Sequence, residues 1–193
     1  MITQLKMAIV RRQGLEVMAM KLKGKKVVLL AENNYQELEL WVPYYRLKEE
    51  GAEVTLVGTG SSRTYTSKHG YPVDVHKEAK EIDMKKYDGI VIPGGYAPDF
   101  MRRYPEMVKL VKDAHDQGKV VAAICHAGWM LASAGILKGK KVTCVPAIKD
   151  DLVNAGGKYL DEEVVKDGNL ITSRKPDDLP AFCREIINAL AKE

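Results

Sequence analysis

A cysteine followed directly by a histidine, Cys125-His126, is the pair best suited to chemistry in this sequence. It follows a β-branched, apolar run from Val120 to Ile124 and precedes a stretch of small residues that predicts a helix start. The residues two before and two after the cysteine, Ala123 and Ala127, are both small, as a tight strand-to-helix elbow requires. Unpaired N–H groups at a helix N-terminus favour a thiolate. We therefore predict that Cys125 is a nucleophile and His126 its base; the alternative is a buried, unreactive cysteine.

The positions of the histidines exclude two familiar arrangements around such an elbow. An α/β-hydrolase needs its catalytic histidine well downstream of the nucleophile, and a class I glutamine amidotransferase needs a later histidine and glutamate near the last strand. No histidine follows His126, and the stretch expected to hold the later pair is Ser173-Arg174-Lys175-Pro176-Asp177. Any partners of Cys125 must therefore come from other segments.

Three such segments follow predicted strands, where open α/β sheets place their active sites. The first carries Glu39, whose carboxyl group could point at the edge of the sheet, whereas Glu37 is expected to be a solvated helix carboxylate. The second, residues 93–99, has two glycines after a strand, which lets backbone N–H groups face a ligand as an oxyanion hole requires. The third, residues 146–151, is expected to form the rim of the same mouth.

The elements that must position these residues alternate between strands and helices. Such alternation predicts parallel strands with right-handed crossovers, and hence a three-layer α/β sandwich with a flavodoxin-like, mostly parallel sheet. Residues 63–75, with Gly70 and Pro72, indicate a hairpin. The predicted strands are 26–31, 53–57, 89–92, 120–124, 141–144 and 169–172, and the predicted helices are 36–50, 105–117, 127–134, 148–154 and 178–191.

Length and composition bound the remaining possibilities. A chain of 193 residues with 46% hydrophobic residues is most simply one α/β domain, residues 25–193, after an extension of unassigned role, residues 1–24. No apolar run approaches the roughly 18 residues of a membrane span. Three unevenly placed cysteines argue against a disulfide framework and for the cytoplasm. No spacing typical of a metal site occurs, so we expect neither metal nor cofactor.

The positive net charge of the chain lies at its beginning. Residues 1–26 hold seven Lys and Arg against one Glu, so the remainder is mildly acidic although the whole chain carries a formal charge of +4. A nucleic-acid-binding protein would instead gather its positive charge on a folded face. We therefore expect neither a nucleic-acid partner nor a membrane partner.

Several motifs in order resemble the PfpI (ThiJ/PfpI) intracellular protease family, of the glutamine-amidotransferase-like superfamily. The resemblance extends from about residue 25 to residue 190. The motifs are Glu-Leu-Glu-Leu-x-x-Pro-Tyr-x-Arg-Leu-Lys-Glu-Glu-Gly at 37–51, Lys-His-Gly-Tyr at 68–71, Pro-Gly-Gly-Tyr-Ala-Pro-Asp at 93–99, Ala-Ile-Cys-His at 123–126, Pro-Ala-Ile-Lys-Asp-Asp at 146–151 and Ser-Arg-Lys-Pro-Asp-Asp-Leu-Pro-Ala-Phe at 173–182.

The resemblance implies a role for each matching residue. Cys125 matches the family nucleophile, His126 its base, and Glu39 the carboxyl group beside the sulfur. That carboxyl group should be partly protonated, because two adjacent anions disfavour each other. The N–H groups of Gly95 and His126 match the oxyanion hole. Asp99 matches a carboxylate that reaches the histidine of a neighbouring subunit, which implies a homo-oligomer, a dimer or a dimer-based hexamer.

The sequence departs from the family pattern at three places. Gln36 stands where relatives often have an acidic residue, and Val145 stands where archaeal relatives have a tyrosine near the nucleophile. Ala127-Gly128-Trp129 replaces a common Gly-Pro-Gln. These departures bear on the substrate more than on the nucleophile.

The resemblance implies an intracellular peptidase-like hydrolase, in which Cys125 attacks a carbonyl carbon of a peptide. One alternative is a glyoxalase III or protein deglycase acting on methylglyoxal and its adducts, which begins with the same attack on a small reactive carbonyl. A second alternative is a redox-sensing or chaperone stress protein that uses the same cysteine. All three readings need an accessible Cys125.

Overall fold

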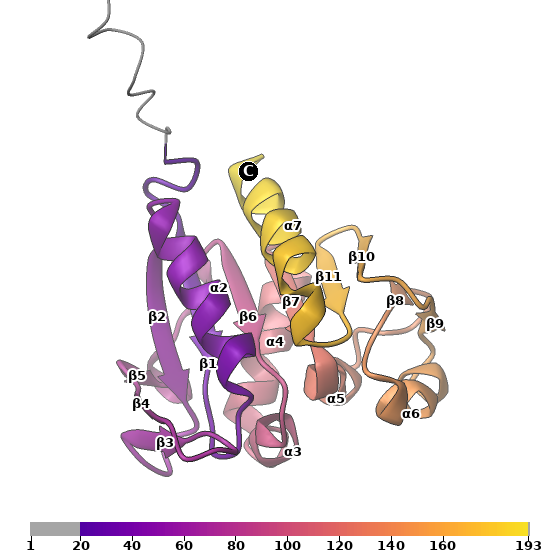
Figure 1. Ribbon diagram of the computed structural model, residues 1–193, viewed down its shortest axis with the longest axis horizontal. Coiled ribbons are helices and arrows are strands. Elements are labelled where there is room, and N and C mark those ends of the chain that lie inside the picture. The colour runs from indigo at the N-terminus through magenta and orange to yellow at the C-terminus, as the bar shows by residue number, and fades with distance from the viewer. Residues whose placement is uncertain (1–19, 193) are drawn as a thin grey trace, which may run out of the picture.

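A sheet of seven strands runs through the molecule, and all but one of its strands are parallel. The computed structural model describes residues 20–192, and Figure 1 shows the strands in the middle of the fold. β10 pairs antiparallel with β11, and the other neighbours pair in parallel. In spatial order the strands are β10 (Val164–Asp167), β11 (Leu170–Ser173), β7 (Val120–Ile124), β6 (Gly89–Ile92), β1 (Lys26–Leu30), β2 (Glu53–Gly58) and β5 (Lys77–Glu78).

Helices cover both faces of this sheet, which confirms the predicted three-layer α/β sandwich. α2 (Glu37–Glu49) and α7 (Leu179–Ala191) contact each other on one face, in front of the sheet in Figure 1. α4 (Pro105–Asp116) and α5 (Gly128–Ser133) contact each other on the opposite face, and α3 (Ala97–Met101) packs on α5. The carboxyl ends of the parallel strands all point to the end of the molecule where α3 and α5 begin.

The hairpin agrees with the prediction, whereas the short strands, two of them at the edges of the main sheet, differ from it. β3 (Thr64–Thr66) and β4 (Pro72–Asp74) form the predicted hairpin. The predicted strand 141–144 is wrong in extent and place, because only β8 (Lys141–Val142) is a strand and it pairs with β9 (Lys158–Tyr159), beside α6 (Lys149–Asn154). The chain leaves the ladder there because the Thr143 N–H donates to the Thr172 side chain instead. β5, β9 and β10 had not been predicted, since each is short and mostly not apolar.

The core lies between the sheet and its two helical layers. Every residue of β7 and β11 is buried, which explains why these strands are continuous apolar or small-residue runs. α7 turns Phe182, Ile186 and Leu190 inward at helical spacing, and each is at most 1% exposed. Truncating a buried phenylalanine to alanine typically lowers the free energy of unfolding by about 3–5 kcal/mol. Cys144 and Cys183 are buried, as expected of structural cysteines.

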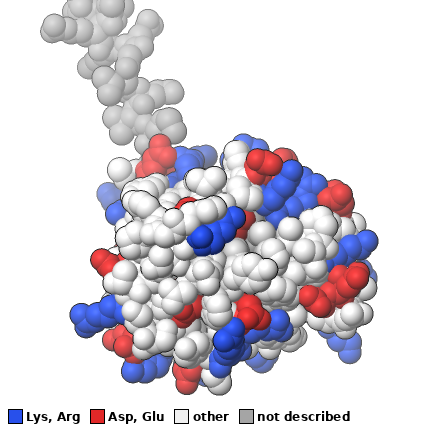
Figure 2. All heavy atoms as spheres, turned by 60° about the horizontal axis from the view of Figure 1, so that its bottom comes forward, with Lys and Arg blue, Asp and Glu red and all other residues white. Residues whose placement is uncertain are grey.

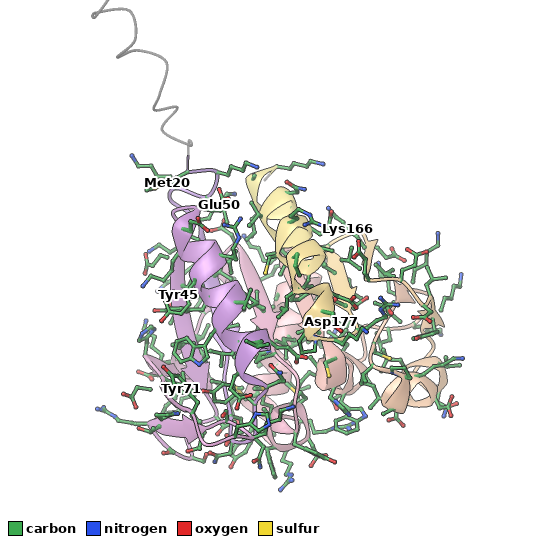
Figure 3. The ribbon with its side chains drawn as sticks, in the orientation of Figure 1. Met20, Tyr45, Glu50, Tyr71, Lys166 and Asp177 are labelled. Atoms are coloured by element: carbon green, nitrogen blue, oxygen red, sulfur yellow. The ribbon has the colours of Figure 1, made fainter. Side chains whose placement is uncertain are left out.

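The first described residues pack against the end of α2. Leu22 is fully buried in the core although it lies within the predicted extension, and its N–H donates to the Glu50 carbonyl at 2.8 Å. Figure 3 shows Met20 beside Glu50 at this end of the molecule. The predictions for residues 1–19 lie outside the described residues. Within residues 20–192, none of the helices is long and apolar enough to cross a membrane.

Candidate active site

The elbow predicted around Cys125 is present. β7 ends at Ile124 in extended conformation, and Cys125 then takes a φ of +62°, in the left-handed region that non-glycine residues seldom adopt. Such a conformation costs of order 1–3 kcal/mol and persists only where the surroundings impose it. Small residues are needed here, because a Cβ on Gly128 would lie 2.8 Å from Leu152. The tight turn therefore places the thiol at the carboxyl end of the sheet, and the surrounding residues maintain its strained conformation.

Three residues place polar groups beside the Cys125 sulfur. Nδ1 of His126 lies 3.3 Å from Sγ. The backbone N–H groups of His126 and Gly95 both hydrogen-bond toward the sulfur. The carboxyl group of Glu39 lies close enough to hydrogen-bond with it as well. The structure thus brings together Cys125, His126, Glu39 and Gly95 from three segments that are far apart in the sequence.

Glu39 is a fully buried acid on the first turn of α2. Its Oε2 accepts a 2.8 Å hydrogen bond from the Gly94 N–H, whereas its buried Oε1 has no hydrogen-bond partner among the described residues. Burial raises the pKa of Glu39 from 4.5 to about 7, against the lowering effects of Gly94 and Cys125. A protonated Oε1 can donate to the sulfur, so the expectation of a partly protonated Glu39 agrees with this pKa.

The expectation that the elbow by itself favours the thiolate is wrong. Burial raises the pKa of the Cys125 thiol to about 12, and the negative charge of Glu39 adds to this effect. The N–H groups of His126 and Gly95 lower the pKa, but they do not outweigh the loss of water. The thiolate must therefore form together with a proton acceptor and with a neutral Glu39.

His126 has the properties of that acceptor. Its pKa is lowered by burial and then by the positive charge of Lys68, so the imidazole is neutral at physiological pH. The ring has two aromatic neighbours: Tyr96 stacks on it at a centroid distance of 6.1 Å, and Trp129 lies at 5.1 Å. A neutral imidazole 3.3 Å from a thiol is placed to take its proton.

Two glycines let the loop after β6 approach the elbow. A Cβ on Gly94 would lie 2.6 Å from Glu39 Oε2 and 2.8 Å from the Cβ of Cys125. Gly95 has a φ of +75°, and a Cβ there would lie 2.4 Å from the Asn34 carbonyl oxygen. The same carbonyl accepts the Tyr96 N–H at 2.9 Å, so the loops after β1 and β6 are joined along their backbones.

Comparison with known proteins identifies the family of this chain. The model of the DJ-1/PfpI family matches residues 25–189. The chain belongs to the DJ-1/PfpI family. It is similar to a deglycase of Pyrococcus abyssi, with 44% identity over 86% of this chain and 99% of that protein.

Other relatives carry different names. "Putative cysteine protease YraA" of Bacillus subtilis is 37% identical over 86% of this chain and 99% of its own. Among solved structures, a two-domain protein of Anabaena variabilis with DJ-1/ThiJ/PfpI-like and ferritin-like domains superposes with a TM-score of 0.84 at 42% identity. The match covers 86% of this chain, which spans about half of that longer protein.

The first departure from the family pattern has a structural role at the start of α2. Gln36 is the N-cap residue of this helix, and its Oε1 accepts the Glu39 N–H at 3.0 Å. An N-cap side chain satisfies a backbone donor that the helix leaves free. Gln36 therefore fixes the turn that carries Glu39. Val145, at the second departure, is half-buried against the core before the rim.

Glu37 is not the solvated carboxylate that we expected. It accepts hydrogen bonds from the Ser67 hydroxyl and the His69 N–H, and His69 Nδ1 lies 3.0 Å away. Burial opposes its charge, but these hydrogen bonds prevail and lower the pKa of Glu37 to about 2. The contact fastens the hairpin turn to α2. It places Lys68 where its charge reaches both Glu39 and His126, a role that the sequence had not indicated.

Trp129, at the third departure, belongs to the rim. Its Nε1 donates to Oδ2 of Asp151 at 2.7 Å, and Arg102 lies over its ring at 5.9 Å. The predicted rim segment, residues 146–151, thus contacts the site through Asp151. Figure 2, which brings this end of the molecule forward, shows charges of both signs interspersed rather than one charged patch.

Asp99 lies on α3, and no hydrogen bond joins its carboxylate to Cys125 or His126 of its own chain. Its carboxylate is 45% exposed and forms a 2.9 Å ion pair with Arg103, one helical turn further on. An exposed pair of this kind contributes little to stability. The described residues hold no group of three or more His, Cys, Asp or Glu side chains that could bind a metal ion.

Proposed function

We propose that this protein is a cofactor-independent cysteine enzyme in which Cys125 attacks a carbonyl carbon. The observation that carries the proposal is the strained elbow, which holds Sγ 3.3 Å from the neutral imidazole of His126 and toward two backbone N–H groups. A nucleophile, a base and an oxyanion site within reach of one atom are what addition to a carbonyl requires.

The first steps follow from the placement of these groups. His126 takes the thiol proton as Sγ bonds to the carbonyl carbon, and the carbonyl oxygen becomes an oxyanion. The N–H groups of Gly95 and His126 then bind that oxygen, because the sulfur that they contacted has become neutral and covalently bonded. Protonated Glu39 stabilises the developing thiolate by donating to it before the attack. Removing one oxyanion donor typically lowers kcat by about 10²–10³-fold.

For the substrate we propose the adducts that methylglyoxal forms with amines, and methylglyoxal itself. In the adduct, sulfur displaces the amine at the former aldehyde carbon, and protonated His126 supplies the proton that the amine needs to leave. The remaining hemithioacetal shifts a proton from this carbon to its neighbour and becomes a thioester of lactate. Water then hydrolyses the thioester, which releases lactate and restores the thiol. The names of relatives such as the P. abyssi deglycase support this substrate class.

A peptidase is the second candidate, supported by the name of YraA. Cys125 would then attack a peptide carbonyl, and His126 would protonate the departing amine. The resulting acyl thioester is hydrolysed by water as before. The two candidates share the nucleophile, the base and the last step, and they differ in the carbonyl compound that enters.

We further propose that a neighbouring copy completes the site. Asp99 is exposed and half a turn from the start of α3, so its carboxylate is available to a second chain. A carboxylate beside His126 would raise the pKa of that imidazole and favour its protonated form after proton transfer. Assembly into a dimer or a dimer-based hexamer, together with residence in the cytoplasm, belongs to the same proposal.

The deciding experiment compares wild type with Cys125→Ser on a methylglyoxal-modified amine, on methylglyoxal and on unfolded casein. Cys183→Ser is the matched control, because that thiol is buried in α7 away from the site. We expect lactate from the first two substrates, lost in Cys125→Ser and kept in Cys183→Ser. Activity that survives in Cys125→Ser would refute the covalent mechanism. No turnover together with clean oxidation of Cys125 by dilute peroxide would favour a redox sensor instead.

A further inference from the structure

Glu32 is a buried carboxylate without a cationic partner. It lies two residues after the end of β1, and the residue is only 3% exposed. Its Oε1 accepts a 2.8 Å hydrogen bond from the Asn33 N–H, and its Oε2 accepts hydrogen bonds from the hydroxyl groups of Thr59 and Ser61. Within residues 20–192 no Lys, Arg or His forms an ion pair with it. Buried carboxylates are normally paired with a cation, so Glu32 has hydrogen-bond donors but lacks a cationic partner.

A cavity of about 430 Å³ lies against this carboxylate. It is lined by residues 32–34, Ser61, Phe100, Arg103 and Tyr104. The walls come from the loop after β1, the loop after β2 and the helix after β6. In the sheet order, β1 lies between β2 and β6. The strand that follows β1 in the chain is therefore added on one side of it, and β6 is added on the other side. Open α/β sheets bind ligands at this switch point, at the carboxyl ends of the strands.

The opposite wall of the cavity carries a positive charge. Arg103 ion-pairs with Asp99 through one nitrogen, and its other N–H groups have no acceptor among the described residues. The guanidinium lies 4.5 Å from the ring centre of Phe100, which holds its plane in place. A guanidinium with free N–H groups recognises a carboxylate. Phe100 and Tyr104 add aromatic surface to the lining of the cavity.

We propose that this cavity binds a free α-amino acid with an apolar side chain. The ammonium group would bind the Glu32 carboxylate, the carboxylate would bind Arg103, and the side chain would pack on Phe100 and Tyr104. Neither Cys125 nor His126 lines the cavity, and the proposal does not use the nucleophile or its base. Arg103 does pair with Asp99, the residue proposed to reach a neighbouring copy. The cavity also meets the loop after β6 through the backbone, since Asn34 lines the cavity and its carbonyl accepts the Tyr96 N–H.

Calorimetric titration of the full chain with L-phenylalanine tests this site. Phenethylamine lacks the carboxylate and 3-phenylpropionate lacks the ammonium group, so they probe the two ends separately. We expect L-phenylalanine to bind with a Kd below about 1 mM and each half-ligand to bind at least about 10-fold more weakly. No heat from L-phenylalanine, or equal affinity of a half-ligand, would overturn the proposal.

Substitutions inside and outside the cavity test whether L-phenylalanine binds there. Glu32→Gln keeps the shape of the side chain and removes its charge, and Arg103→Gln changes an exposed residue that the fold does not need. Each should weaken binding at least about 10-fold. Glu53→Gln and Arg63→Gln, at exposed positions outside the cavity, should bind like wild type, and so should Cys125→Ala. Unchanged affinity in both Glu32→Gln and Arg103→Gln would place the ligand elsewhere and refute the site.

Discussion

The indole Nε1 of Trp129 donates a 2.7 Å hydrogen bond to Oδ2 of Asp151. This bond joins α5, which starts just after the elbow, to α6 on the rim of the site. It holds the indole beside the His126 ring, at a centroid distance of 5.1 Å. Tyr96 lies beside the imidazole as well, so two aromatic rings contribute to its burial. Shielding of this kind lowers the pKa of His126.

Replacing the indole should therefore change the titration of His126. In Trp129→Ala the imidazole gains water, so its pKa should rise toward the ordinary value of 6.5. NMR observation of the ring protons measures this pKa directly. Only the neutral imidazole can act as the base, so activity falls as His126 becomes protonated. The acid limb of the pH–activity profile should therefore move to higher pH by the same amount as the pKa.

Trp41→Ala is the matched control, because Trp41 belongs to an aromatic cluster with Tyr44, Tyr45 and Tyr71. Tyr45 and Tyr71 of this cluster lie on the flank of α2 in Figure 3. The control should leave the pKa of His126 unchanged. If Trp129→Ala left it unchanged too, burial by the indole would not be the cause of the lowered value.

Glu39 should make the protein less stable as the pH rises. Its folded-state pKa of about 7 lies above the unfolded value of 4.5, so the folded state binds the proton more tightly. Below pH 4.5 Glu39 is protonated in both the folded and the unfolded state, so its titration does not lower the free energy of unfolding. Between pH 4.5 and 7 the unfolded state loses its proton first, and above pH 7 the full cost of about 3 kcal/mol applies.

Glu39→Gln should remove this cost while keeping an oxygen to accept the Gly94 N–H. We expect urea unfolding to show a gain of about 3 kcal/mol over wild type at pH 8 and little difference at pH 4.5. Glu53→Gln, at a 66% exposed side chain, should show no such pH-dependent gain. A destabilised Glu39→Gln at pH 8 would show that the ionised carboxylate is stabilised by its surroundings.

The elbow and the sheet could be predicted from the sequence because local rules govern them. Ala123, Ala127 and the apolar run before Cys125 specify a tight turn after a buried strand whatever packs around it. The pKa of Cys125 could not be predicted in this way, since it depends on how far loops from other segments cover the sulfur. The N–H groups at the helix end lower the pKa of the thiol, but burial of the sulfur has the larger and opposite effect.

The contacts that sequence reasoning missed join residues far apart in the chain. Glu37 meets Ser67 and His69 across the hairpin, and Trp129 meets Asp151 across the rim. The residue types alone suggest a solvated carboxylate at Glu37 and leave Trp129 either at the mouth of the site or in the core. The capping role of Gln36 is the exception, because a polar residue before a helix carrying Glu at its third position is a signal that the sequence contains.

The charge of Glu39 should also control the reactivity of Cys125. At pH 8 Glu39 is mostly ionised and raises the pKa of the neighbouring thiol, so the thiolate is scarce. Glu39→Gln removes that charge, and each pKa unit recovered gives about tenfold more thiolate. Alkylation by iodoacetamide at pH 8, followed by mass spectrometry of the Cys125 peptide, should therefore be faster in the variant. Slower alkylation would mean that the carboxyl group chiefly donates a hydrogen bond to the thiolate.

Gly95→Ala should impair both stability and activity. The added Cβ would lie 2.4 Å from the Asn34 carbonyl oxygen, so the backbone must move and take the Gly95 N–H away from the sulfur. Gly118→Ala is a close control, because Gly118 has a similar φ of +73° and open space around its Cβ. The control should lose about 1 kcal/mol of stability and no activity. Gly95→Ala should lose more stability than this and about 10²-fold in kcat. Equal behaviour of the two variants in urea unfolding and turnover would show that the Gly95 N–H has no part in binding the oxyanion.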